Sequence, residues 1–275
     1  MSPTPPTTRI DRVGVIGRGY VGSAVVSVLE DVADVRFHDP AVDGSAPLEV
    51  LARWADALFV CVPTPRGPDG RADTRTVMAV MAELARLETT AAILLKSTVP
   101  PGTCTAITAR HPTLHLAFNP EFLRERHHLA DARAPHRIVL GWSPRPPEAA
   151  PLRDLFARRF PDVPLVELSS GEAELMKVAS NAFFGVKVSF ANELRELAIQ
   201  LGLDWEPVRQ ALVLDPRIGD AHLRVPGPDG AVGFGGACLP KDMAGLVQFA
   251  EDSGVDLEVV AAALRANTRR RPDSD

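Results

Sequence analysis

Cysteines and long apolar runs are both scarce in this sequence, and each shortage excludes a class of protein. The 275 residues include only three cysteines, Cys61, Cys104 and Cys238, whose wide spacing matches neither a disulfide framework nor a zinc site. Free thiols fit a reducing cytoplasm, which is the location we expect. No apolar run approaches the length of a membrane-spanning helix. The net charge of -5 argues against nucleic acid or an anionic membrane as the main partner.

The two ends of the chain and its histidines show little functional pattern. Residues 1–8 are rich in proline and threonine and lack an apolar segment, which predicts a disordered leader rather than a signal peptide. The basic run 269–271 is interpreted first as a solvated tail and only second as a binding patch. We expect no metal, because these five histidines lack the spacing of metal ligands: His111, His115, His127, His128 and His136.

The order of apolar segments predicts two domains. Short apolar strands alternate with helical segments up to about residue 170, which is typical of an α/β Rossmann-like, doubly wound sheet. Residues 171–201 then carry a helical pattern without proline, and shorter helical segments follow. We therefore predict an NAD-binding domain over residues 1–170 and an all-helical domain over 171–275 with a long central helix. Because so long a helix in a small domain usually packs against a partner, we expect a homodimer.

A glycine motif near the start predicts a dinucleotide site. The strand 12–16 runs directly into Gly17-Arg18-Gly19-Tyr20-Val21-Gly22, and helical composition follows. These glycines allow a tight turn and a close approach to a pyrophosphate, while the helix end supplies N–H donors. Asp39 follows the next strand, where an acid would bind the ribose hydroxyls of NAD and disfavour a 2′-phosphate. The alternative, a glycine turn that binds no phosphate, is less consistent with this combination.

Polar loops follow several of the predicted strands. The strand 57–62 leads to Thr64, the strand 91–96 leads to Ser97 and Thr98, and the strand 114–118 leads to the segment 119–125. In a doubly wound sheet, ligands bind beyond the carboxyl ends of the strands. We therefore expect these loops to converge on one crevice, and we expect Cys61 and Cys104 to be inert.

The stretch 233–243, Gly-Phe-Gly-Gly-Ala-Cys-Leu-Pro-Lys-Asp-Met, predicts an activated thiol. Proline favours the first position of a helix, so Pro240 places Cys238 beside a helix N-terminus. The helix dipole and Lys241 both favour the thiolate, and Asp242 is close enough to hold a water or a proton. The alternative is a glycine-rich turn that holds a buried, structural cysteine.

Two polar residues of the long helix form a second candidate pair. Lys177 and Asn181 are four residues apart, which places both side chains on one face. A cation and an amide together suit an oxyanion. The alternative is a solvated lysine and an asparagine with no role outside its helix.

Seven motifs together resemble the UDP-glucose/GDP-mannose dehydrogenase family. They are Gly17-x-Gly19-Tyr20-Val21-Gly22, Val62-Pro63-Thr64-Pro65, Lys96 to Thr103, Asn119 to Glu125, Lys177-x-x-x-Asn181, Lys187 to Glu193, and the cysteine stretch. The resemblance implies an NAD domain, a dimer-forming helical domain, and the oxidation of a primary alcohol to a carboxylate with two NAD⁺. Its substrates are sugar nucleotides.

The resemblance also implies residue roles. Cys238 would form a thiohemiacetal and then a thioester, and Lys177 and Asn181 would stabilise the oxyanions. The residues that would position water or remove protons are Thr98, Glu125 and Asp242. Glu121 would support its loop. The residues implied to contact NAD are Gly17, Gly19, Tyr20, Val21, Gly22, Asp39, Thr64, Ser97, Thr98 and Lys241. Those implied to contact substrate are Glu121, Phe122, Leu123, Lys177, Asn181, Arg217, Phe234 and Gly235, and Arg217 would reach a neighbouring subunit.

The sequence departs from the family pattern on the substrate side. Arg126 replaces the usual glycine, the segment 226–232 is longer than usual, and the chain stops at Asp275 before the family's second nucleotide-binding domain. Two interpretations follow. The chain is an active dehydrogenase for a sugar nucleotide or a related sugar or nucleoside, or it is a non-catalytic NAD-binding partner subunit. We favour the enzyme because Cys238, Lys177, Asn181 and Asp242 are all present.

Overall fold

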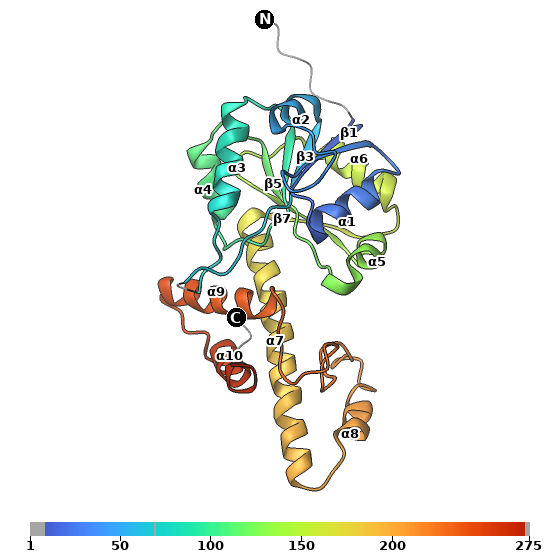
Figure 1. Cartoon of the computed structure of the whole chain (residues 1–275), viewed down its shortest axis with the longest axis vertical. Coiled ribbons are helices and arrows are strands. Elements are labelled where there is room, and N and C mark those ends of the chain that lie inside the picture. Colours follow the sequence, from blue (N-terminus) through green and yellow to red (C-terminus); the bar gives the residue numbers. More distant parts are fainter. Residues whose placement is uncertain (1–8, 69, 273–275) are drawn as a thin grey trace, which may run out of the picture. The chain divides into compact units, whose positions relative to one another are not determined.

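The computed structural model describes residues 9–68 and 70–272 (Figure 1). The described residues form two compact units. The first runs up to Thr64 and resumes from Thr74 to Leu175, while the second combines Pro65–Asp73 with the chain from Met176 onward. The leader predicted for residues 1–8 lies outside the described residues.

A mostly parallel sheet forms the centre of the first unit. Within the described residues it has seven strands in the order β2-β1-β3-β4-β5-β6-β7. The strands are β1 (Arg12–Ile16), β2 (Asp34–His38), β3 (Ala57–Val60), β4 (Ala92–Leu95), β5 (Leu116–Phe118), β6 (Ile138–Trp142) and β7 (Leu165–Ser169). Strands β1 to β5 are parallel, β6 is antiparallel to β5, and β7 is parallel to β6. The carboxyl ends of β1 to β5 therefore lie at one edge.

Helices cover both faces of this sheet, as the unbroken apolar strands require. They are α1 (Tyr20–Leu29), α2 (Leu48–Trp54), α3 (Arg75–Arg86), α4 (Thr103–Arg110), α5 (His128–Arg133) and α6 (Ala149–Arg159), with a 3₁₀ turn at Glu125–His127. Figure 1 shows α1, α5 and α6 on one side of the strands and α2, α3 and α4 on the other. The core of the first side packs side chains of α1 and α6 against β1 and β3. This arrangement confirms the predicted Rossmann-like sheet.

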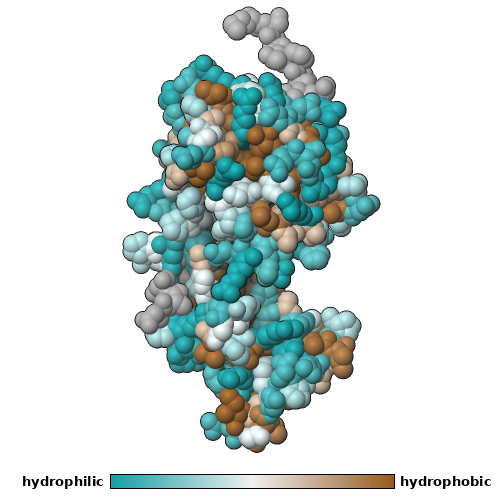
Figure 2. Space-filling model, turned by 45° about the vertical axis from the view of Figure 1, so that its right-hand side comes forward, coloured by the Kyte–Doolittle hydropathy of each residue, from teal (hydrophilic) through white to brown (hydrophobic). Residues whose placement is uncertain are grey.

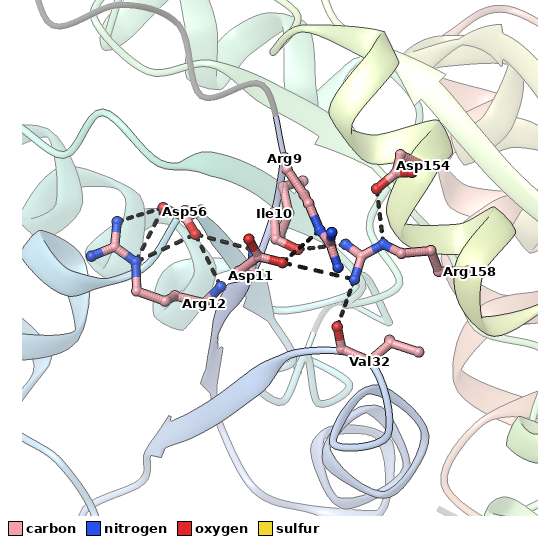
Figure 3. Close-up of polar contacts among 8 residues, drawn as sticks. All are labelled: Arg9, Ile10, Asp11, Arg12, Val32, Asp56, Asp154 and Arg158. Atoms are coloured by element: carbon pink, nitrogen blue, oxygen red, sulfur yellow. Dashed lines mark hydrogen bonds and ion pairs between the residues drawn. The ribbon is translucent and has the colours of Figure 1, made fainter.

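Ionic contacts fix the beginning of β1 (Figure 3). The guanidinium of Arg12 lies 2.6 Å from a carboxylate oxygen of Asp56, and Asp56 also accepts the backbone N–H of Arg12 at 2.9 Å. On α6, Arg158 donates to the carbonyls of Ile10 and Val32, at 2.6 Å each. These contacts hold the strand that leads into the glycine motif.

The second unit is helical, as the sequence predicts. Its helices are α7 (Ser170–Gln200), which begins in the first unit, α8 (Trp205–Leu212), α9 (Leu239–Asp252) and α10 (Glu258–Arg270). A small core packs Val178 and Ala182 of α7 against Phe234, Met243 and Leu246. Within residues 9–68 and 70–272, no helix combines the length and the apolar character needed to cross a membrane.

The loop 65–73 belongs to the second unit although it follows β3 in the chain. A guanidinium nitrogen of Arg71 lies 2.5 Å from a carboxylate oxygen of Asp252 on α9. A Cβ on Gly245 would lie 3.7 Å from the backbone nitrogen of Ala72, which is an ordinary van der Waals distance and shows that the loop lies close to α9. The loop therefore packs on the helix that carries Cys238 at its N-terminus.

Candidate active site

The glycine motif of the first unit is shaped for close backbone approach. Gly17 has a φ of +87°, and a Cβ there would lie 2.9 Å from the carbonyl oxygen of Cys61. A Cβ on Gly22 would lie 1.9 Å from the Gly17 carbonyl oxygen, so neither position tolerates a side chain without movement. Gly19 caps α1, and Tyr20 and Val21 form its first turn. The turn leaves the N-terminus of α1 available to a pyrophosphate.

Asp39 lies next to this turn and is held in one orientation. Its carboxylate accepts the backbone N–H of Arg18 at 2.7 Å and that of Ala41 at 3.0 Å. These hydrogen bonds lower the pKa of Asp39, because they stabilise the ionised carboxylate. Asp39 is thus an oriented negative charge at the end of β2, where an acid would bind the ribose hydroxyls of NAD.

The loops after β3 and β4 are joined by side-chain hydroxyls. The hydroxyl of Thr64 donates to the carbonyl of Thr98 at 2.9 Å, and the hydroxyl of Ser97 donates to the carbonyl of Val62 at 2.6 Å. The structure therefore brings together Thr64, Ser97 and Thr98, all predicted to contact the cofactor. Because Thr64 and Ser97 are buried, these hydrogen bonds also fix the two loops relative to each other.

The segment after β5 carries the predicted acids Glu121 and Glu125. The carboxylate of Glu121 is buried and accepts the backbone N–H of Leu123 at 2.7 Å, which supports the predicted role in holding this loop. Phe122 packs beneath the guanidinium of Arg137, whose central carbon lies 4.0 Å from the ring centre. Glu125 is exposed at the start of the 3₁₀ turn. The two acids thus differ in burial, and only Glu125 is open to solvent.

In the second unit, Cys238 occupies the N-cap of α9 and is partly exposed. Pro240 lies in the first helical turn, and the backbone N–H of Asp242 donates to the carbonyl of Cys238 at 2.8 Å. The helix of 14 residues directs the positive end of its dipole at the thiol. This is the environment that favours a thiolate.

Asp242 is the centre of a buried polar cluster. The side-chain amide of Asn181 donates to one carboxylate oxygen at 2.5 Å, and the ammonium of Lys241 lies 2.6 Å from the other. Lys177 is also buried, one helical turn before Asn181 on α7. The structure therefore joins Asn181, Lys241 and Asp242, and Lys241, predicted to contact NAD, is paired with Asp242.

Arg217 lies on the loop that follows α8. Its side chain is 87% exposed and forms a two-point ion pair with Asp215, with nitrogen to oxygen distances of 2.5 and 2.9 Å. The ammonium of Lys187 on α7 donates to the carbonyls of Ile218 and Gly219, at 3.0 and 3.2 Å. The loop is thus anchored on α7 while Arg217 itself projects into solvent.

Sequence reasoning missed the side chains that hold the glycine-rich stretch before Cys238. Asn192 on α7 and Asn267 on α10 both bind its backbone. The prediction of a solvated tail at 269–271 is wrong, because Arg270 pairs with Glu196 and Arg271 pairs with Asp229, and both guanidiniums are largely buried. Their acidic partners lie far away in the sequence, so no local pattern pointed to these contacts.

Among the described residues, no three or more histidine, cysteine, aspartate or glutamate side chains are grouped so that they could hold a metal ion. The polar groups of the second unit are instead a thiol, two lysines, an amide and a carboxylate. Such a set can stabilise an oxyanion and serve a covalent intermediate on sulfur.

Comparison with known proteins identifies the family. Residues 41–159 match the NAD binding domain of the UDP-glucose/GDP-mannose dehydrogenase family, and residues 171–269 match its central domain. The chain is 36% identical to UDP-glucose 6-dehydrogenase of Rickettsia conorii, over 78% of this chain and 50% of that protein. It is 32% identical to UDP-glucose 6-dehydrogenase AglM of Haloferax volcanii, over 93% of this chain and 69% of that protein.

A solved structure supports the same relationship. The UDP-glucose dehydrogenase of the archaeon Pyrobaculum islandicum matches with a TM-score of 0.84 and 31% identity, over 97% of this chain and 70% of that one. The chain spans about half the length of the Rickettsia relative. The described fold, the NAD-binding domain and the helical domain all agree with the matched domains, and the chain belongs to the UDP-glucose/GDP-mannose dehydrogenase family.

Proposed function

We propose that this chain carries out the NAD-dependent oxidation of a primary alcohol of a sugar nucleotide, or of a related sugar or nucleoside, to a carboxylate. The observation that supports this most is the cluster around Asp242 beside the N-capping Cys238. A thiol at a helix N-terminus, in a unit that also holds the buried Asn181 and Lys177 and the nearly buried Lys241, suits covalent chemistry at a carbonyl carbon. The names of the relatives support the substrate class.

Cofactor binding is proposed to use the first unit. The space left by Gly17 and Gly22, together with the N-terminus of α1, fits a pyrophosphate, and the ionised Asp39 fits ribose hydroxyls. Thr64, Ser97 and Thr98 are proposed to contact the rest of the dinucleotide. When bound, NAD⁺ would accept one hydride in each of the two oxidations.

The residues of the chain have separate proposed tasks in the second oxidation. The thiolate of Cys238 attacks the aldehyde carbon, and the resulting alkoxide is stabilised by the ammonium of Lys177 and the amide of Asn181. Loss of hydride converts this thiohemiacetal into a thioester. Water then cleaves the carbon–sulfur bond, which releases the carboxylate and restores the thiol. Asp242, Thr98 and Glu125 are proposed to orient that water and take up its proton, while Glu121 holds its loop.

A homodimer is part of the proposal. Phe183, Phe190 and Leu197 recur every seven residues on α7 and are 62%, 53% and 54% exposed. Residues with this spacing share one helix face, and a second copy of the helix would cover them. Arg217 is exposed on the same unit and is proposed to contact the substrate of the neighbouring subunit.

The thiol chemistry also leads us to propose a cytoplasmic location. Cys238 has to stay reduced in order to act as a nucleophile, and a reducing compartment favours this state. All three cysteines, which are all described, are free thiols in the structure. This can be tested by adding a thiol-reactive label that cannot cross membranes to intact cells that express the chain. A cytoplasmic protein stays unlabelled under these conditions.

Turnover with a panel of substrates tests the proposed function. UDP-glucose, GDP-mannose, UDP-N-acetylhexosamines, free nucleosides and sugar phosphates are each supplied with NAD⁺. We expect at least one substrate to give two NADH for each carboxylate formed. Cys238→Ser should abolish carboxylate formation without weakening NAD binding, and Cys61→Ser serves as the matched control with normal product formation.

The same panel can refute the proposal. If the purified wild-type chain binds NAD⁺ but oxidises none of these substrates, the non-catalytic partner subunit becomes the better interpretation. If Cys238→Ser forms the carboxylate at the normal rate, the covalent route through sulfur is wrong even though the oxidation itself stands.

A further inference from the structure

The glycine-rich stretch before Cys238 is held by two asparagines. Asn267 on α10 accepts the backbone N–H of Phe234 at 2.7 Å and donates its own amide to the carbonyl of Phe234 at 2.8 Å. Asn192 on α7 accepts the backbone N–H of Gly233 at 2.9 Å. The side chain of Asn267 thus binds both polar atoms of one residue in the loop.

Both asparagines are isolated from solvent. Asn267 and Asn192 are each 2% exposed, so water cannot replace a hydrogen bond that either one loses. The fit is close as well, because a Cβ on Gly233 would lie 2.5 Å from the side-chain oxygen of Asn267. Gly233 has a φ of +70°, a conformation that glycine adopts without strain. The loop backbone is therefore confined to one position against α10.

The loop is fixed through its side chain too. The ring of Phe234 is buried in the core beside Val178 of α7 and Met243 of α9. The helix α10 is in turn attached to α7, because the hydroxyl of Ser189 donates to the carbonyl of Ala263 at 2.9 Å and Arg270 pairs with Glu196. The position of the loop is therefore defined relative to α7, the helix that carries Lys177 and Asn181.

Cys238 follows Phe234 by four residues, and only small residues lie between Phe234 and the thiol. Gly235 and Gly236 carry no side chain that could anchor this stretch to the core. Gly235 packs directly against the guanidinium of Arg271, and Phe234 is the residue whose backbone N–H and carbonyl are both held by one buried side chain. A shift there moves the sulfur relative to the ammonium of Lys177 and the amide of Asn181.

We propose that Asn267, assisted by Asn192, is a positioning residue that sets the place of the Cys238 thiol relative to Lys177 and Asn181. This inference rests on the proposed function, in which that thiol attacks an aldehyde carbon. Attack on carbon requires close alignment, and a misplacement of about 1 Å can cost on the order of a hundredfold in rate. Asn267 itself does not touch the reacting atoms.

The experiment compares two substitutions at Asn267 with a neighbouring control. Asn267→Asp keeps the acceptor for the Phe234 N–H but places an oxygen against the Phe234 carbonyl, whereas Asn267→Leu removes both hydrogen bonds. Thr268→Val is the control, because its hydroxyl bonds only within α10, to the carbonyl of Leu264. The readouts are the rate at which iodoacetamide alkylates Cys238, hydrogen exchange at the amides of Gly233 and Phe234, and the steady-state kinetics.

We expect both Asn267 variants to change the alkylation rate of Cys238 by about tenfold or more and to slow carboxylate formation by a similar factor. The affinity for NAD⁺ should stay within about twofold of the wild type, and Thr268→Val should match the wild type in every measurement. In Asn267→Asp the ratio of variant to wild-type alkylation rates should return toward one as the pH falls, because a protonated aspartate donates to the Phe234 carbonyl again.

The alkylation rate requires no turnover, so it tests the position of the thiol even if the chain oxidises no sugar nucleotide. The inference is wrong if hydrogen exchange at Gly233 and Phe234 accelerates while the alkylation rate and its pH profile stay unchanged. If thermal unfolding shows that the Asn267 variants do not fold, Asn192→Ala is measured in the same way. This variant removes the hydrogen bond to the Gly233 N–H and a second one to the Val188 carbonyl within α7. An alkylation rate equal to that of the wild type in folded Asn192→Ala would then overturn the inference.

Discussion

The three thiols differ sharply in their surroundings. Cys61 follows β3 directly and is partly exposed, and desolvation raises its pKa to about 12, with the positive charge of Lys96 opposing this effect and the negative charge of Glu121 adding to it. Burial also raises the pKa of Cys104 well above its ordinary value, and the carboxylate of Glu174 beside it acts in the same direction. Cys238 is partly exposed like Cys61, but it lies at a helix N-terminus. Only this third thiol combines access with an environment that favours the thiolate.

Alkylation should therefore be selective. Under native conditions near neutral pH, we expect iodoacetamide to modify Cys238 at least about tenfold faster than Cys61 or Cys104, because the thiolate is the reacting species. Peptide mass spectrometry after timed quenching measures the three rates separately. The Cys238→Ser variant should remain almost unlabelled over the same period, and rapid labelling of Cys61 in folded protein would contradict the explanation.

Asp39 should decide between the two nicotinamide cofactors. Its carboxylate is ionised and fixed by the N–H groups of Arg18 and Ala41, so a 2′-phosphate would meet a negative charge that cannot turn away. We expect Asp39→Ala to lower the preference for NAD⁺ over NADP⁺ by about tenfold or more, which corresponds to about 1.4 kcal/mol. Binding titrations with both cofactors measure this preference, and an unchanged ratio would remove Asp39 from the proposed site.

At the scale of elements, Glu174 links the start of α7 to the start of α4. Its fully buried carboxylate accepts the backbone N–H of Gly102 at 2.6 Å and that of Cys104 at 2.8 Å. Burial raises the pKa of Glu174, and the N–H donors only partly offset this effect. The helix dipole stabilises a carboxylate at a helix N-terminus, but the ionised form is costly here because the side chain is isolated from water.

The raised pKa predicts how stability changes with pH. The folded chain binds a proton at Glu174 more tightly than the unfolded chain does. The protonated side chain therefore makes its full contribution to the free energy of unfolding below the unfolded pKa, near 4.5, and this contribution is lost as the pH rises through the folded pKa. Relative to Glu174→Gln, we expect the wild type to lose up to about 1.4 kcal/mol per pH unit in this window. Urea unfolding across pH measures the free energy of unfolding of both proteins. A wild type whose stability relative to Glu174→Gln stays constant or rises with pH would contradict the assignment.

Gly185 allows α7 and α9 to pack closely. A Cβ there would lie 2.0 Å from the sulfur of Met243, which is fully buried. In an exposed helix, replacing glycine with alanine gains about 0.5–1 kcal/mol, whereas overpacking a core costs about 1–3 kcal/mol. We expect overpacking to dominate, because Met243 is fully buried and a Cβ on Gly185 would also lie 3.0 Å from its methyl carbon and 3.4 Å from its Cγ.

We therefore expect Gly185→Ala to lower the free energy of unfolding by about 1 kcal/mol or more. Met243→Ala should cost less in the Gly185→Ala background than in the wild type, because the added methyl group occupies part of the cavity. Urea unfolding of the two single variants and the double variant gives the coupling energy. Additive effects of the two substitutions would show that Gly185 and Met243 do not compete for the same space.

The elements that can be predicted from sequence are those that depend on local pattern. The prediction of a helix over 171–201 differs from α7 by one residue at each end, because an uninterrupted run without proline leaves few alternatives. The strands and the glycine turn follow similarly from apolar runs and from the spacing of the glycines, and Gly17 has the positive φ that such a turn requires. The antiparallel pairing of β6 with β5 cannot be predicted in this way, because no local sequence signal shows that the chain reverses its direction there.

Within the candidate site, the same distinction holds. Cys238 and Asp242 can be predicted because both lie at the start of one helix, and Asn181 can be predicted because it follows Lys177 by one turn. Asn267 and Arg271 were missed because they act on a backbone more than thirty residues earlier in the chain (267 − 234 = 33). Contacts of this kind depend on how α10 packs, which becomes visible only in three dimensions.

For the whole molecule, the exposed apolar side chains of the second unit matter most. Figure 2 shows hydrophobic patches among polar surface at the end of the unit that holds the α7–α8 turn, where the exposed side chains include Leu197, Ile199, Leu201 and Leu203. Large exposed apolar areas are uncommon on monomers. Together with Phe183 and Phe190, these residues are proposed to face a second copy of the chain.

A charge in this surface should prevent dimer formation. We expect Phe190→Glu to shift the wild-type dimer to a monomer at micromolar concentration, because association would bury an unpaired carboxylate. Val50→Glu on α2 is the matched control, since Val50 is 49% exposed and Phe190 is 53% exposed. Size-exclusion chromatography with light scattering measures the masses. A wild-type chain that is already monomeric, or a dimeric Phe190→Glu, would disprove the proposed interface.

The membership of loop 65–73 in the second unit affects how the chain can be divided. A single cut after Leu175 would leave this loop on the N-terminal fragment, while Asp252 and Gly245, which it contacts, would belong to the C-terminal one. A C-terminal fragment expressed alone would therefore expose the face of α9 that the loop covers. To produce the helical unit with its loop, the chain has to be circularly permuted or both fragments have to be co-expressed. In either case loop 65–73 can pack against α9 again.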